Sequence, residues 1–485
     1  MKSCFRLNRL GFAGLVFLLL LAGTGQSRAA VSPVAPVLLP FTPDTNGVVS
    51  GEINYQLAYT GTVTRFSQGG LPRGLNLDTK TGAITGRPEV ADTYTIHFTA
   101  YNGTAKSNTL SLEWTVEPLP PGTAGTYYAL LDRHAWYNGG YGGSLRLTVA
   151  STGRYSGVIT RGVHRNTITG QLDTVPGGLV DPTGSFVIPR RSPYDPLEVA
   201  FSLPIGSASI IGTLQEPGGD VIQLAGYRAS TATPTFAGAQ WNTALEISNS
   251  LLGDDTYPQG AGWAIQKFTK TGVGYWTLRL ADGTSSTFST ALGSSGQVGV
   301  HVMLYNNAGS LQGYQVFDPN SGLTAGSLGW IRSAFAARIY GSGFPLHYLT
   351  ATGARYTPPA SGSMIFGITP GTSNVRLIFS EAGLGSPYTQ LFSLGAGNRV
   401  TIPTGTSANP YGIRFTINFS TGVITGTGTA MDYLENQPQN SRSGSFSALL
   451  IPGREQAVGH FLLPTSRSSS SAILSGSVIG EEVNN

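Results

Sequence analysis

Short segments in which apolar and polar residues alternate, separated by turns, constrain the fold of this chain more than any other feature. Between residues 127 and 227 eight such segments follow one another, at 127–131, 144–150, 154–160, 167–172, 184–189, 197–203, 209–214 and 221–227. A period of two places successive side chains on opposite faces of a strand. The connections are too short for crossover helices, so we expect antiparallel up-and-down sheets that close into barrels or sandwiches.

Composition agrees with an all-β fold. Charged residues make up 11% of the chain, against roughly 25% in an average soluble domain. The 66 glycines, together with many Ser, Thr, Tyr, Phe and Val residues, are typical of strands and turns. The hydrophobic share of 40% is too high for a disordered chain.

Proline-rich stretches divide the chain into domains. The run 118–122, Pro-Leu-Pro-Pro-Gly, is expected to be a stiff linker, and softer boundaries lie near 231–237 and 356–362. The predicted organisation is a signal peptide at 1–29, a first β domain at 32–117, a linker at 118–126, and β modules at 127–230, 236–355 and 360–485.

The first 29 residues read as an export signal. Lys2, Arg6 and Arg9 precede an apolar run from 10 to 22, and small residues follow it, with cleavage expected after Ala29. The run is shorter than the ~20 residues of a membrane-spanning helix. We expect a secreted, cell-surface or periplasmic bacterial protein without a stable membrane span after cleavage.

Removal of this segment changes the counts that bear on partners. The only cysteine, Cys4, lies in it, so the remaining chain is expected to have no disulfide and no cysteine metal site. Four of the 29 basic residues also lie in it, and the remaining 25 balance 25 acidic residues. A nucleic-acid partner is not expected, because phosphate binding needs an excess of Lys and Arg.

One region resembles a known family. The run from Gly69 to Asn102, GGLPRGLNLDTKTGAITGRPEVADTYTIHFTAYN, contains a Leu-Pro-x-Gly-Leu turn, a Leu-Asp-x-x-Thr-Gly hairpin, an Ile-x-Gly-x-Pro exit and a Tyr-x-Ile strand. These motifs resemble the putative Ig domain of exported bacterial proteins, a relative of cadherin-like and dystroglycan-type sandwiches. The resemblance implies an Ig-like β-sandwich at 32–117.

The resemblance also raises the question of calcium. Cadherin relatives often bind calcium between domains, which implies calcium as a cofactor and calcium-dependent adhesion as a function. The acidic residues here, Glu52, Asp78, Asp92 and Glu113, are scattered and do not form the clustered oxygen ligands that calcium needs. On the residues alone we expect no cofactor and no metal site.

Three hairpin-like segments suggest repeated modules. They run 145–157, 265–276 and 415–426, and each joins an alternating strand through a Thr-Gly turn to a returning strand. Glycine supplies the positive φ of a tight turn. A single copy is ordinary in hairpin-rich proteins, whereas three copies favour repeated modules.

No catalytic motif is found. The chain has no Gly-x-Ser-x-Gly elbow, His-Glu-x-x-His helix or phosphate-binding loop. The six histidines are far apart in the sequence, and none is paired at metal-ligand spacing. We expect no enzymatic activity, although a site assembled from distant strands leaves no local signature.

An aromatic loop is the candidate binding site. Residues 132–141 place rings beside hydrogen-bonding groups; the candidate carbohydrate- or ligand-binding residues are Asp132, Arg133, Trp136, Tyr137 and Tyr141. Exposed rings stack on sugar faces, whereas buried ones plug the end of a barrel. We favour the second interpretation, in which the rings plug the end of a barrel.

The predicted function is therefore non-catalytic. We expect adhesion, scaffolding or ligand binding at the cell surface, with an unidentified surface protein or glycan as the partner. The alternatives are a protein that binds or hydrolyses polysaccharide and a calcium-dependent, cadherin-like adhesin.

Overall fold

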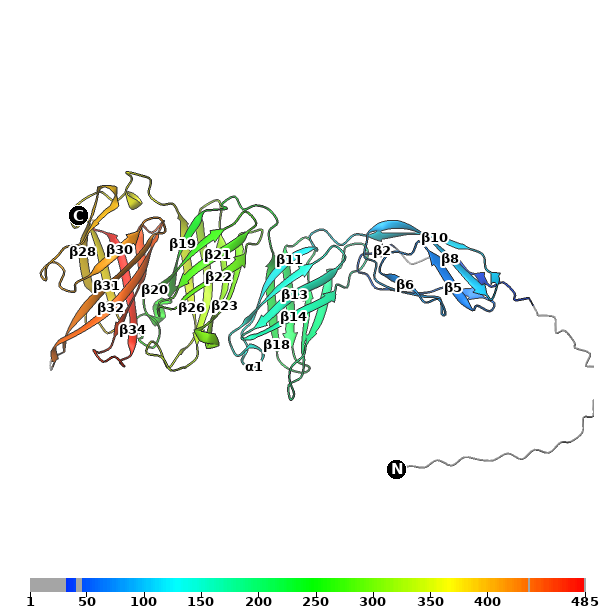
Figure 1. Ribbon diagram of the computed structural model, residues 1–485, viewed down its shortest axis with the longest axis horizontal. Coiled ribbons are helices and arrows are strands. Elements are labelled where there is room, and N and C mark those ends of the chain that lie inside the picture. The colour runs from blue at the N-terminus through cyan, green and yellow to red at the C-terminus, as the bar shows by residue number, and fades with distance from the viewer. Residues whose placement is uncertain (1–31, 41–45, 435–436, 484–485) are drawn as a thin grey trace, which may run out of the picture.

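Four β domains lie in a row along the long axis of the molecule (Figure 1). The computed structural model describes residues 32–40, 46–434 and 437–483, with side chains omitted at 431–440. The predicted signal peptide at 1–29 therefore lies outside the described residues. The expected fold class is confirmed, because an Ig-like sandwich is followed by three eight-stranded antiparallel sheets.

The first domain is a two-sheet sandwich. One sheet has the order β2-β10-β8-β5, with β9 beside β8, and the other β3-β7-β6, while β1 pairs with β4. Trp114, Phe98 and Phe66 are buried between the sheets. The strands are β1 (Val37–Leu38), β2 (Gly47–Val48), β3 (Ile53–Gln56), β4 (Tyr59–Thr60), β5 (Arg65–Gly69), β6 (Leu75–Leu77), β7 (Ala83–Gly86), β8 (Asp92–Asn102), β9 (Ala105–Lys106) and β10 (Leu110–Glu117).

Each of the other three sheets curls into a barrel in which neighbouring strands are consecutive in the chain. Barrel 1 contains β11 (Gly125–Leu131), β12 (Gly143–Val149), β13 (Arg154–Arg161), β14 (His164–Gln171), β15 (Thr183–Ile188), β16 (Leu197–Ser202), β17 (Ser209–Gln215) and β18 (Val221–Arg228), with the one-turn helix α1 (Ala135–Asn138). The first strand pairs with the last, β11 with β18, and β14 lies next to β15.

Barrels 2 and 3 have the same strand order, and their first strands likewise pair with their last, β19 with β26 and β27 with β34. Barrel 2 contains β19 (Gln240–Ile247), β20 (Ala261–Phe268), β21 (Val273–Arg279), β22 (Ser285–Ala291), β23 (Gln297–Leu304), β24 (Gly309–Phe317), β25 (Leu323–Arg332) and β26 (Phe344–Tyr356). Barrel 3 contains β27 (Val375–Glu381), β28 (Tyr388–Gly395), β29 (Arg399–Thr401), β30 (Arg414–Asn418), β31 (Val423–Leu434), β32 (Gln437–Ile451), β33 (Gln456–Pro464) and β34 (Ile473–Glu482). Single 3-10 turns occur at Asn249–Leu251, Tyr305–Asn307, Ile365–Gly367 and Ala396–Asn398.

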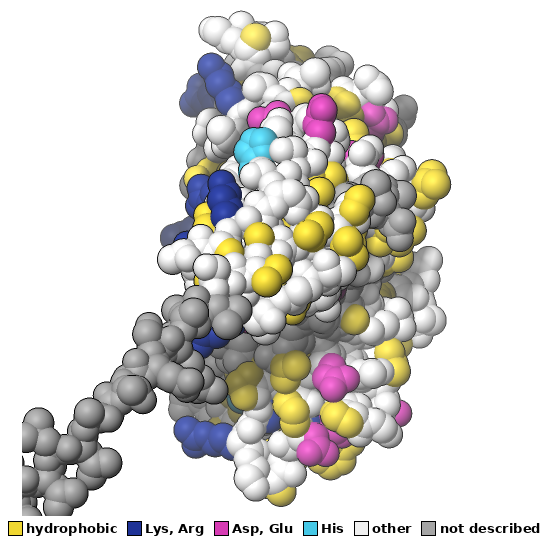
Figure 2. Space-filling view, turned by 90° about the vertical axis from the view of Figure 1, so that its right-hand side faces the viewer, with side chains coloured by type: hydrophobic (Ala, Val, Ile, Leu, Met, Phe, Trp, Pro, Cys, Tyr) yellow, Lys and Arg dark blue, Asp and Glu magenta, His cyan; other side chains and the backbone are white. Residues whose placement is uncertain are grey.

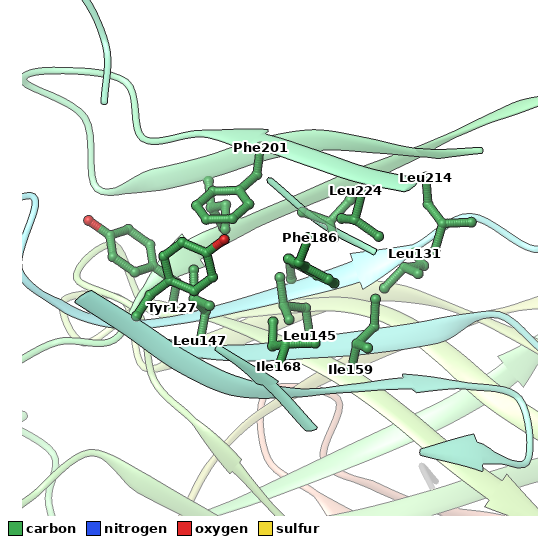
Figure 3. Close-up of a cluster of buried hydrophobic side chains, with 14 of the residues drawn as sticks. Tyr127, Leu131, Leu145, Leu147, Ile159, Ile168, Phe186, Phe201, Leu214 and Leu224 are labelled. Carbon is green, nitrogen blue, oxygen red and sulfur yellow. The ribbon is translucent and has the colours of Figure 1, made fainter. Parts of the chain in front are cut away.

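The core of barrel 1 follows directly from the alternation in the sequence. Tyr127, Leu145 and Ile159 point inward from three neighbouring strands and meet Phe186 and Phe201 from the opposite wall (Figure 3). Their sequence neighbours point outward. The eight segments expected between residues 127 and 227 are thus the eight strands of one closed meander.

The Thr-Gly turns form as expected, but the third is not equivalent to the others. Gly153, Gly272 and Gly422 all have positive φ, between 74° and 81°. The first two turns join the second and third strands of their barrels, whereas Gly422 joins β30 to β31, the fourth and fifth strands of barrel 3. The repeated Thr-Gly pattern therefore marks a tight turn in general and does not identify equivalent positions in the three barrels.

Barrels 2 and 3 are fused through their outer walls. Ala244, Trp263 and Ile265 leave the outer face of β19 and β20 and pack against Leu449 and Val458 of barrel 3. The Asn242 amide donates to the carbonyl of Leu450 at 2.8 Å, and the Trp263 indole donates to Ser447 Oγ at 3.1 Å. β19 and β20 are consequently buried on both faces, and barrel 3 packs directly against barrel 2 (Figure 1).

The surface carries few charges. Figure 2, which looks at the Ig-like end of the row, shows backbone and uncharged side chains with many hydrophobic ones, and only scattered basic and acidic groups. In the part of the chain that the structure describes, no helix has the length and apolar character needed to cross a membrane.

Candidate binding site in the mouth of barrel 3

The aromatic loop predicted from the sequence is divided between three environments. Asp132 and Trp136 are exposed, and the Trp136 ring retains 77% of its accessible surface. Tyr137 is only 2% exposed, so its ring has no face free to stack on a sugar. The segment also forms the one-turn helix α1 rather than an irregular loop, because Asn138 accepts from the backbone N–H of His134.

Arg133 and Tyr141 contact the next barrel. The Arg133 guanidinium donates to Ser310 Oγ at 2.7 Å and to the carbonyl of Gly329 at 2.8 Å. The Tyr141 hydroxyl lies 2.7 Å from Ser333 Oγ. Burial lowers the pKa of Arg133 to about 10, which leaves it charged at neutral pH. These two residues join barrel 1 to barrel 2 and are not available for a ligand.

We call the end of each barrel at which its first strand ends the mouth of that barrel. The mouth of barrel 1 is plugged by Tyr137, whose hydroxyl donates to the carbonyl of Asp220 at 2.8 Å. Arg161, buried on β13, donates to the Tyr137 carbonyl at 2.8 Å. Tyr137 thus lies where the plug interpretation expects a ring.

The mouth of barrel 2 is filled by a buried ion pair and its aromatic neighbours. The Arg332 guanidinium donates to Asp282 Oδ2 at 2.9 Å, and both side chains are almost fully buried. The guanidinium lies between the rings of Tyr305 and Phe335, 4.5 and 4.4 Å from their centroids. The Tyr305 hydroxyl donates to Asp282 and accepts from the Trp330 indole. Burial, reinforced by Asp282, raises the pKa of Tyr305.

The mouth of barrel 3 is hollow. A cavity of about 530 Å³ opens there between the ends of the strands and the loop that joins β27 to β28. Its apolar lining consists mainly of Phe379, Leu384, Tyr388, Tyr411, Ile413, Phe446, Phe461, Leu463 and Leu474. This volume lies within the range of about 300–1,000 Å³ that is typical of small-molecule sites.

Small residues on two neighbouring strands create this space. Gly428 on β31 and Gly444 on β32 are direct cross-strand partners, and Ala430 is opposite Arg442. In barrel 2, by contrast, the cross-strand partners Leu311 on β24 and Trp330 on β25 are large and fully buried in the core. The two glycines add no side chain of their own to the interior of barrel 3, and only Ile413 and Leu463 lie over them.

Polar groups surround the rim of the cavity. Arg442 donates to the carbonyls of Pro464 at 2.9 Å and Gly383 at 3.2 Å, which ties β32 to β33 and to the β27–β28 loop. The Tyr388 hydroxyl donates to Gln390 Oε1 at 2.6 Å. Burial raises the pKa of Tyr388 to about 12, with a smaller effect from Tyr411, so the phenol is neutral at physiological pH.

A sequence signal for this cavity lies in β31. In the run Val-Ile-Thr-Gly-Thr-Gly-Thr-Ala at 423–430, Gly426, Gly428 and Ala430 alternate with threonines. A strand with that period places only the smallest side chains on one face. Once the barrel is known, a strand that turns only such small side chains inward predicts unfilled volume inside the barrel. Among the described residues, no group of three His, Cys, Asp or Glu side chains is arranged to hold a metal ion.

Comparison with known families concerns the first domain. The pattern of the family described as "Putative Ig domain" matches residues 31–117. The first domain is similar to this family. The resemblance seen in the motifs between Gly69 and Asn102 is thereby confirmed, and the remaining domains lie outside the match. No curated protein matches the chain.

Several solved structures match the chain weakly, two of them over most of its length and one over about half of it. A transferrin binding protein B variant from Haemophilus parasuis is 11% identical over 93% of this chain and 95% of its own, with a TM-score of 0.16. Transferrin binding protein B from Neisseria meningitidis is 11% identical over 90% and 78%, with a TM-score of 0.20. A protein of the DUF3598 family from Nostoc punctiforme is 10% identical over 48% and 97%, with a TM-score of 0.18. At these scores no conclusion about fold or ligand is transferred to this chain.

Proposed function

We propose that this chain is an exported, non-catalytic binding protein that takes a small apolar ligand into the mouth of barrel 3. The observation that carries the proposal is the cavity of about 530 Å³ in that mouth, in a molecule whose other two barrels have the same end filled by Tyr137 and by the Arg332–Asp282 pair. The Ig domain and barrels 1 and 2 then act as the support that presents barrel 3.

The lining of the cavity supports binding rather than catalysis. The lining residues include no His, Asp, Glu or Cys, so the serine, threonine and tyrosine hydroxyls of the lining have no imidazole or carboxylate base among the lining side chains to activate them. Aromatic and aliphatic side chains dominate it. Apolar area removed from water stabilises a complex by about 25 cal/mol per Å² before the costs of association are subtracted.

The proposal is tested with N-phenylnaphthylamine, an uncharged dye whose fluorescence rises in apolar sites. The intact protein should bind the dye saturably. Leu474→Trp places a larger side chain in the cavity lining and should weaken binding at least about tenfold. Leu391→Trp is the matched control, because Leu391 is 42% exposed on the same barrel and does not line the cavity.

Two outcomes contradict the proposal. One is the absence of saturable dye binding to the folded protein. The other is binding that Leu391→Trp weakens as much as Leu474→Trp does, because the dye would then be reporting surface adsorption.

Export rests on the amino-terminal segment and has its own test. Protein recovered from outside the cytoplasm should begin at Ala30 when its amino terminus is sequenced. Recovery of the full-length chain from the cytoplasmic fraction, with residues 1–29 retained, would contradict this part of the proposal.

A second candidate function is glycan binding by barrel 1. The observation that favours it is the exposed Trp136 ring on α1, next to His134 and its partner Asp220 at 3.2 Å. An exposed ring beside hydrogen-bonding groups can stack on a sugar face. Retention on insoluble polysaccharide that Trp136→Ala abolishes would support this function, and no retention on any glycan would exclude it.

A further inference from the structure

The cavity in barrel 3 is shallow and has a floor. The Phe379 ring lies 5.2 Å from Phe446 and 5.7 Å from Phe461, in edge-to-face geometry in both pairs. Below these rings Phe415, Leu377 and Leu450 are buried and fill the barrel. A second void deeper in barrel 3 measures only about 30 Å³, which is enough for one or two water molecules. An occupant of the mouth cannot extend down the barrel axis.

Rings also form one wall of the cavity. The Tyr388 and Tyr411 rings are 3.9 Å apart between centroids, at 60° to each other. Tyr388 in turn stacks against Phe379 at 6.2 Å. Five aromatic rings therefore line the floor and this wall. The aliphatic side chains of Ile413 and Leu463 lie over Gly428 and Gly444 and complete the lining beside the rings.

We infer that the mouth of barrel 3 selects compact molecules with rings over extended acyl chains. This inference rests on the proposed function of the same site. A rigid ring system fits a short, wide space without losing internal freedom, whereas a chain must fold back on itself and loses rotamer freedom. Ring partners also gain from offset and edge-to-face contact with the aromatic lining, which an alkyl chain does not.

The test is a competition between two uncharged alcohols of matched size. Naphthol and decanol each displace the dye N-phenylnaphthylamine from the intact protein in separate titrations. Decanol is the more hydrophobic of the two, so an apolar surface without shape selectivity should bind decanol more tightly. The inference predicts the opposite order, with naphthol displacing the dye at the lower concentration.

A variant identifies the wall responsible. Tyr411→Leu keeps an apolar side chain but removes a ring, and should reduce the preference for naphthol by at least about threefold. Tyr348→Leu is the matched control, because Tyr348 is 61% exposed on β26 of barrel 2. It should leave the preference unchanged.

The outcomes separate this inference from the proposed function. No dye binding removes both. Dye binding with decanol as the stronger competitor overturns the ring preference and leaves the binding function in place. An unchanged preference in folded Tyr411→Leu also overturns the assignment of the ring wall. If that variant does not fold, the competition on the unaltered protein still decides the question.

Discussion

The mouths of barrels 2 and 3 belong to sheets of the same topology and differ in what their strands send inward. In barrel 2 Leu311 and Trp330 face each other across neighbouring strands, and Arg332 and Asp282 close the end above them. In barrel 3 the cross-strand partners Gly428 and Gly444 line the mouth, and a cavity opens there. The topology therefore sets the shape of the wall, and the size of the inward residues decides whether the barrel is a filled support or a container.

The two mouths should also differ in their contribution to stability. A filled mouth contains buried charges and closely packed rings, so that each group depends on its partners. A hollow mouth lacks those van der Waals contacts and has room for additional atoms. The predictions below use this difference, from the largest expected effect to the smallest.

Breaking the ion pair in barrel 2 should have the largest effect. Asp282→Asn leaves the buried Arg332 without its counter-charge and should destabilise barrel 2 by about 3–5 kcal/mol. The measurement is denaturant unfolding of the full chain, followed by tryptophan fluorescence. The control is Asp255→Asn, an exposed carboxylate in the loop before β20, which should leave the transition unchanged.

A double variant sharpens this prediction. Asp282→Leu combined with Arg332→Met removes both charges and should cost less than Asp282→Asn alone, because no unpaired charge remains buried. If the single variant unfolds at the same denaturant concentration as the unaltered protein, the ion pair does not hold the mouth of barrel 2.

Acid should weaken the contacts of barrel 2 with barrel 1 and with barrel 3 before it affects the mouth of barrel 3. Burial, with a contribution from Arg133, lowers the pKa of His301 to about 4 where barrel 1 meets barrel 2. Burial, with a contribution from Arg279, lowers the pKa of His460 to about 4 where barrel 3 meets barrel 2. Neither histidine lines the cavity of barrel 3.

Because both pKa values are lowered in the folded protein, acid reduces the free energy of unfolding. Both rings are neutral in the folded protein, whereas the unfolded chain titrates near 6.5. Their stabilising contribution is full above pH ~6.5 and is lost as the pH falls towards 4, on the order of 3 kcal/mol for each ring. Thermal unfolding between pH 7 and 4 measures this loss. His460→Gln should flatten the curve, and a curve that stays equally steep would contradict the assignment.

The same substitution in the two mouths should have unequal effects. Leu304, on β23, is 4% exposed in the filled mouth of barrel 2, and Leu304→Trp should overpack it at a cost of about 1–3 kcal/mol. Leu474→Trp enters the cavity of barrel 3 and should change the free energy of unfolding by less than about 1 kcal/mol. Equal costs in denaturant unfolding would mean that the cavity is not open to additional volume.

The sequence predicted the fold better than the site, and the reasons are physical. Strand alternation is local, so residues 127–227 could be read as eight strands, and the Ig motifs lie within one continuous run. Arg332 and Asp282 meet only after barrel 2 has closed, and no local sequence pattern near either residue predicts that the two pair. Tyr137 is buried and the adjacent Trp136 is exposed, because α1 and the barrel end beneath it set the direction in which each ring points.

The most direct test of the account labels single cysteines in a Cys4→Ser background. Leu474→Cys, at the mouth of barrel 3, should react with a maleimide in the folded protein, and saturating N-phenylnaphthylamine should slow the reaction. Leu304→Cys, in the filled mouth of barrel 2, should react only when the protein unfolds. Equal labelling rates at the two positions, or no protection of Leu474→Cys by the dye, would contradict the claim that barrel 3 is the container and barrel 2 its filled support.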